Sequence, residues 1–164
     1  MLSRLGALAF LVGLVACASS GGAHPATPGG VTTRWNGNFR SSGSASSATF
    51  GPATPNRGSG TINLTALGGR GPVLTRVELT IRDAPPNAPV GWAVFGGSCG
   101  SPGPMVTGQT QFPPISVSNS GEGHVKADIG FALDPKSSYH ANVYFTERAN
   151  DMNDIMMCAN LTPQ

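Results

Sequence analysis

The sequence has no hydrophobic run long enough to cross a membrane as a helix, and it carries few charges. Its longest apolar stretch, residues 5–15, is shorter than the roughly 20 residues that a spanning helix needs. Only 10 basic and 8 acidic residues occur among the 164, and the basic ones are scattered. Nucleic-acid binding is not expected, because it needs a concentrated positive surface.

Motifs of nucleophilic and acid–base catalysis are also lacking. There is no GxSxG motif, and the serines lie mainly in Gly/Ser-rich segments. Three histidines, one of which lies in such a segment, cannot easily supply a triad. No two carboxylates stand at a spacing typical of hydrolases. We therefore expect a protein that is not an enzyme.

The N-terminal residues have the pattern of a bacterial lipoprotein signal. Arg4 precedes the apolar run, and the sequence LVAC at 14–17 is followed by small residues. We predict a signal peptide over 1–16 and a lipidated Cys17 as the mature N-terminus. The alternative is an ordinary cleaved signal in which the cysteine is incidental. In a Gram-negative cell, Ala18 after the cysteine favours the outer membrane, with the periplasmic or surface side left open.

The remaining chain divides into a tether and one domain. Residues 17–32 are rich in Ser, Gly, Ala, Pro and Thr with a lone His24, which is typical of a flexible linker. Residues 33–164 form a segment of the length of a single domain.

Besides Cys17, the chain has two cysteines, Cys99 and Cys158. An even pair in an exported protein most simply forms a disulfide. A catalytic or metal-bound cysteine is the alternative, but neither residue has CxxC spacing or a nearby histidine.

Hydrophobic residues alternate with polar ones along most of the domain. The clearest run has Val73, Thr75, Val77, Leu79 and Ile81 on one face. Residues 90–95 are apolar throughout, so we expect that strand to be covered on both faces. The predicted strands are 33–39, 61–66, 73–82, 90–95, 115–117, 124–131, 139–145 and 155–161, with a short edge strand at 48–50 as an option. These strands predict an all-β fold, an antiparallel Greek-key sandwich or barrel of about eight strands with one disulfide.

Metal sites are conceivable in three places. His124 and His140 lie on the polar faces of their strands, near Asp128, Asn142 and Tyr144 in the sequence. If the two strands are neighbours they could form a two-histidine site, although surface histidines are commoner. A methionine cluster stands beside Cys158 and could bind Cu(I), but methionine also fills irregular cores. Its members are Met152, Met156 and Met157. Residues 151–154 offer oxygen ligands but lack the EF-hand pattern, so a polar turn is favoured. We predict no metal site and no cofactor, with the histidines and methionines as weak candidates.

Residues 58–161 resemble the exported β-sandwich group that includes chordin-type (CHRD) domains and, more remotely, Cu/Zn superoxide dismutases. The resemblance rests on four segments, GTINL at 60–64, WAVFGGSCGSPG at 92–103, YHANVY at 139–144 and MCANL at 157–161. In the dismutases, a cysteine after the strand that bears an HxH motif pairs with a cysteine of the last strand. Cys99 and Cys158 occupy those places, so the resemblance also implies the disulfide.

The metal histidines of that group are missing from this chain. Where the families carry HxH, the sequence reads GWAVF at 91–95, and where CHRD-type chains often end a strand in histidine, it has Tyr144. The resemblance therefore implies the fold and the disulfide but argues against dismutation.

The sequence as a whole predicts a membrane-anchored envelope lipoprotein that acts as a binding or structural module. Its partner would be an envelope protein, a glycan or a small molecule. Trp92, Tyr139 or Tyr144 would be contacts if they lay outside the core, although a buried position is favoured for each. The competing hypothesis is periplasmic copper handling or a degenerate dismutase-like protein.

Overall fold

The computed structural model describes residues 33–42, 58–68, 73–147 and 154–164. The predicted signal peptide, the tether with Cys17, the optional edge strand at 48–50 and Met152 lie outside the described residues. Within the described parts the protein is all-β, as predicted, with one 3-10 turn at Gln109–Gln111. No helix in these parts is long and apolar enough to cross a membrane.

The strands follow the predicted positions closely. They are β1 Arg34–Ser41, β2 Ser59–Leu67, β3 Leu74–Arg82, β4 Pro89–Val90, β5 Trp92–Gly96, β6 Ile115–Ser116, β7 Gly123–Ile129, β8 Tyr139–Tyr144 and β9 Ile155–Pro163.

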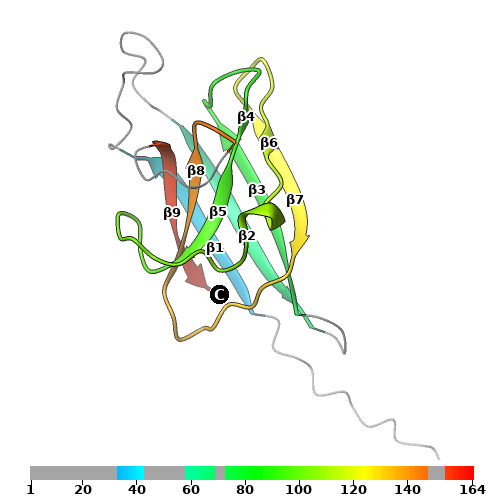
Figure 1. The fold of residues 1–164 in the computed structure, drawn as a ribbon, viewed down its shortest axis with the longest axis vertical. Helices are drawn as coiled ribbons and strands as arrows, with labels where there is room; N and C mark the ends of the chain where they lie inside the picture. The colour runs from blue at the N-terminus through cyan, green and yellow to red at the C-terminus, as the bar shows by residue number, and fades with distance from the viewer. Residues whose placement is uncertain (1–32, 43–57, 69–72, 148–153) are drawn as a thin grey trace, which may run out of the picture.

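Seven strands form one curled antiparallel sheet in the order β5-β8-β9-β1-β2-β3-β7, and β4 and β6 form a small second sheet. The curl brings β5, β8 and β9 in front of β1, β2, β3 and β7, so that the sheet makes both layers of a sandwich (Figure 1). The chain crosses between the layers after β3, after β5 and again after β7, as in a Greek-key sandwich.

The core lies between the layers and is built by the period-two alternation. Trp35, which is 3% exposed, packs edge-on against Tyr139 with ring centroids 5.5 Å apart. Trp92 packs against Phe112 at 5.0 Å and donates its indole N–H to the Pro113 carbonyl over 2.7 Å. These contacts fix the β5–β8–β9 layer against the rest of the domain.

The β5 strand is buried on both faces, as its sequence predicts. The predicted single strand over 90–95 is, however, two strands separated at Gly91. Gly91 donates its backbone N–H to the Thr146 carbonyl over 2.6 Å. A Cβ atom at Gly91 would lie 2.5 Å from the Glu147 carbonyl oxygen, so this close approach requires glycine.

Candidate functional site

The outer face of β8 carries three polar side chains that are buried. His140, Asn142 and Tyr144 alternate along the strand, and each is 1% exposed. Ala141 and Val143 point the other way, into the core between the layers. The three residues form a row that we call the β8 polar row.

His140 is held as a neutral side chain. Its ring stacks on Phe95 of β5 at 5.5 Å with an interplanar angle of 20°. Burial lowers the pKa of His140 below its ordinary value, and a hydrogen bond to the Gly97 backbone partly opposes that shift. Its Nδ1 atom is buried without a hydrogen-bond partner among the described residues.

Asn142 and Tyr144 continue the row. The Asn142 Nδ2 group donates to the Tyr144 hydroxyl over 3.3 Å, but Asn142 Oδ1 is buried and has no partner in the described parts of the chain. Burial raises the pKa of Tyr144, so its hydroxyl keeps its proton at neutral pH. An unsatisfied buried polar atom costs about 1–3 kcal/mol, so this row is retained at a cost in stability.

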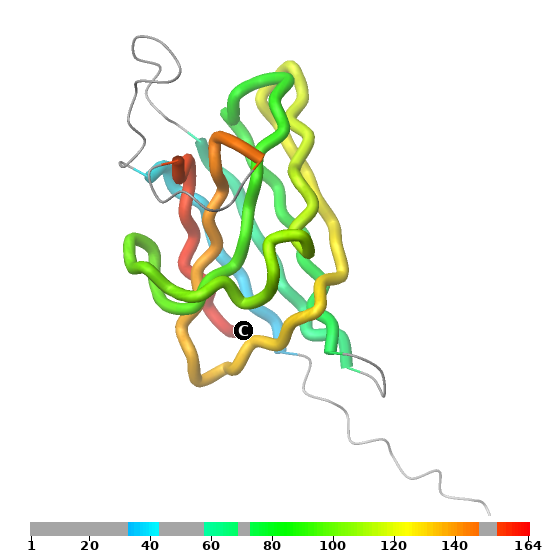
Figure 2. Tube along the Cα trace, viewed as in Figure 1, coloured from blue at the N-terminus to red at the C-terminus, as the bar shows by residue number. Residues whose placement is uncertain are grey.

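The disulfide between Cys99 and Cys158 is formed, as predicted, with a Cα–Cα distance of 5.9 Å. It covers the outer face beside the β8 polar row, because Cys158 is the cross-strand neighbour of Asn142. The segment after β5 loops outward beside β8 and β9 (lime green in Figure 2). Gly97 and Gly100 have φ values of +90° and +81°, which lets this short loop turn back and bring Cys99 over β9.

A shallow groove lies on the other side of the disulfide. It has a volume of about 580 Å³, and we call it the disulfide groove. The residues that line it are Asn38, Arg40, Ser41, Ser42, Cys99, Gly100, Cys158 and Asn160. Cys158 faces Arg40 across the β1–β9 pair and Asn142 across the β8–β9 pair. The disulfide thus separates an open polar groove from a buried polar row.

The opposite layer has a different outer face, where the polar groups pair with one another. Arg76 forms two 2.8 Å hydrogen bonds with Asp128, and Lys126 contacts Glu78 at 2.5 Å. Arg82 lies 3.8 Å from Glu122. These cross-strand pairs leave the β3–β7 face electrostatically satisfied.

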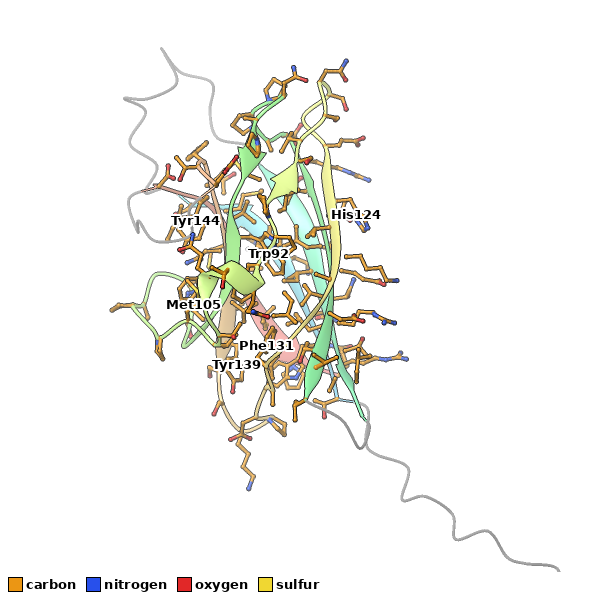
Figure 3. All side chains as sticks on the ribbon, turned by 45° about the vertical axis from the view of Figure 1, so that its right-hand side comes forward. Trp92, Met105, His124, Phe131, Tyr139 and Tyr144 are labelled. Atoms are coloured by element: carbon orange, nitrogen blue, oxygen red, sulfur yellow. A yellow bond between two sulfur atoms is a disulfide. The ribbon has the colours of Figure 1, made fainter. Side chains whose placement is uncertain are left out.

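The two histidines proposed as metal ligands do not come together. His124 is exposed on β7 and contacts the Thr80 hydroxyl at 3.2 Å. It points out of the molecule on the side away from Tyr144 (Figure 3). The Asp128 carboxylate forms an ion pair with Arg76. The expectation that His140 lies on a solvated face is wrong, since the Cys99 loop and Phe95 pack beside it.

The remaining candidates are placed as follows. Met156 and Met157 are fully buried in the core, while Met152 and residues 151–153 lie outside the described residues. Within the described ranges there is no group of three or more His, Cys, Asp or Glu side chains that could hold a metal ion.

Two of the three aromatic residues considered as contacts are fully buried, and the third is partly exposed. Trp92 and Tyr144 are each 1% exposed, and Tyr139 is half-buried with its hydroxyl accepting the Asp134 N–H over 3.0 Å. The groove residues Asn38, Arg40 and Asn160 were not predicted. Alternation marks them as outward-facing but gives no sign that β1 and β9 are neighbours.

Compared with known proteins, the sequence matches no family model and is similar to no curated protein.

Proposed function

We propose that the chain is a lipid-anchored envelope protein, without enzymatic activity, whose β-sandwich is a binding module. Its binding surface is the outer face around the disulfide groove. The anchor part of the proposal rests on the LVAC sequence at 14–17 and the small residues that follow it. The binding part rests on the uneven distribution of unpaired polar groups over the two outer faces.

That unevenness is the observation that carries the proposal. On the β3–β7 face the charged side chains form ion pairs with one another, so no charge there is left without a partner among the described residues. On the β8–β9–β1 face, the charge of Arg40 in the groove has no carboxylate partner among the described residues, and two polar atoms are buried without a partner on the other side of the disulfide. Polar groups that lack a partner within the protein lower its stability, and they are typical of sites that bind a ligand or another molecule.

The metal-handling alternative has less support. A redox or copper site needs several imidazole, thiolate or thioether ligands around one point. The described residues bring His140 next to an amide and a phenol, with Met156 and Met157 inside the core. The resemblance to CHRD-type and dismutase-like domains stays a prediction about the fold family and adds no ligand.

Photo-crosslinking in cells tests the binding surface. A photoreactive amino acid replaces Asn38 in the disulfide groove, and in a control chain it replaces Lys126 on the β3–β7 face. We expect a covalent adduct of defined mass from position 38 and none from position 126. Equal adducts from both positions, or none from position 38, would contradict the proposal.

Fractionation tests the anchor separately. The Cys17→Ser chain should leave the membrane fraction, because it loses the acyl chains that hold it there. Membrane association equal to that of the wild type would show that Cys17 is not lipidated.

A further inference from the structure

The disulfide groove has a positive charge that no described residue of its lining neutralises. Among the described residues that line it, Arg40 is the only charged one. The neighbouring segments 33–42, 92–108, 139–144 and 154–164 contain a single acidic residue, Asp154. Its carboxylate accepts hydrogen bonds from the Thr146 backbone and hydroxyl groups. The described cations of β3 and β7 each have a carboxylate partner, whereas Arg34, at the other end of β1, lies exposed outside these ion pairs.

The groove also offers hydrogen-bond donors in a fixed orientation. The Asn160 Oδ1 atom accepts the Cys99 backbone N–H over 2.8 Å. Because this bond engages the amide oxygen of Asn160, it fixes the orientation of the side-chain amide. The Nδ2 group, which has two N–H donors, is then available to a ligand. Asn38 adds a second amide on the same face of β1. An arginine beside amide donors, without a carboxylate, is complementary to a negatively charged oxygen group.

We propose that the disulfide groove binds an oxyanion, a carboxylate or a phosphate, through the Arg40 guanidinium and the Asn160 amide. This inference rests on the proposed function and names the ligand chemistry of its binding surface. The disulfide serves the site directly, because it presents the Cys99 N–H that orients Asn160. The oxyanion belongs either to a small soluble molecule or to a lipid headgroup, and the two sources share the same recognition.

Two substitutions test the two contacts. Arg40→Gln removes the charge and the bidentate donor, and it should weaken oxyanion binding about tenfold or more. Asn160→Asp keeps an oxygen acceptor for the Cys99 N–H but replaces the ligand-facing donor with a carboxylate oxygen. It should weaken binding at least as much. Arg34→Gln is the matched control, because Arg34 lies exposed on the same strand outside the groove.

The measurement uses the purified full chain titrated with inorganic phosphate and with acetate. Amide chemical shifts of residues 38–42, 99–100 and 158–160 should move in a saturable way. Thermal unfolding of each variant checks that the fold and the disulfide are retained. No saturable shift in the wild type, or an equal loss of binding in the Arg34→Gln control, would overturn the proposal.

A second arm distinguishes the sources. The same chains are sedimented with phosphatidylcholine vesicles, with or without phosphatidylglycerol. If the anionic vesicles bind the wild type and Arg34→Gln but not Arg40→Gln, the ligand is the headgroup phosphate of a lipid. If free anions bind but the vesicles do not, the ligand is a small soluble molecule. If both arms fail while the adduct at position 38 persists, the oxyanion is wrong and the binding surface stands; if the adduct is also missing, both proposals fall.

Discussion

Removing the disulfide tests how the loop over the outer face is held in place. The double substitution Cys99→Ser with Cys158→Ser breaks the bond without leaving a free thiol. The two cysteines are 59 residues apart in the sequence. Loop-closure entropy for a link of that length stabilises the folded state by about 4 kcal/mol at 25 °C. The double variant should therefore lose about that much free energy of unfolding.

Urea denaturation measures the loss, and thermal unfolding gives an independent value. The midpoint temperature should fall by about 10–20 °C for a domain of this size. Reductant should produce the same loss in the wild type and no further loss in the double variant, which makes the reduced wild type the matched control. The slope of the urea transition should increase slightly, because the unfolded chain becomes less compact.

A loss below about 1 kcal/mol would refute this reasoning. It would mean that noncovalent contacts alone hold the loop. The available contacts are the 2.8 Å hydrogen bond from Gly97 N–H to the Ser138 carbonyl and the 2.8 Å bond from Cys99 N–H to Asn160. Two such hydrogen bonds together stabilise the folded state by about 1–3 kcal/mol. This is less than the about 4 kcal/mol expected from the disulfide, so the measured loss distinguishes the covalent from the noncovalent explanation.

Three further predictions follow from other parts of the structure. Below pH 6.5 the free energy of unfolding of the wild type should fall by up to about 1.4 kcal/mol per pH unit, because His140 binds a proton in the unfolded chain but, with its lowered pKa, not in the folded one. The His140→Gln variant should show a smaller slope in urea titrations run down to about pH 5. Gly91→Ala should destabilise by roughly 1–3 kcal/mol in thermal unfolding, since its Cβ meets the Glu147 carbonyl, and an unchanged midpoint would contradict the close approach. Replacing both Arg76 and Asp128 with alanine should hardly move the midpoint, because their ion pair is exposed; a large drop would show that the pair is structural.

Strand positions and the disulfide could be predicted because both depend on local or compositional rules. The alternation in β3 places Val77, Leu79 and Ile81 on one face, and all three are fully buried. The pairing of Cys99 with Cys158 was predictable from an even cysteine count together with the predicted export, and the structure contains it. These features need no knowledge of which strands are neighbours.

The site could not be predicted in the same way. Period-two alternation tells which residues share a face but not whether another segment covers that face. His140 and Asn142 have the alternation of solvent-facing residues, yet they are buried beside a loop that the distant Cys158 holds in place. The groove likewise joins Arg40 of the first strand with Asn160 of the last, a pairing set by sheet order alone.

The position of β9 in the sheet has a consequence for how the chain folds. β9 follows every other strand in the sequence, yet it lies inside the sheet, between β8 and β1. Until β9 has been synthesised, the β5–β8 pair and the β1–β2–β3–β7 group each carry an unpaired edge and cannot be joined. The sheet therefore closes late, through contacts between residues far apart in the chain, which slows folding. The exposed edges of β8 and β1 leave the chain prone to edge-to-edge aggregation until that last strand arrives.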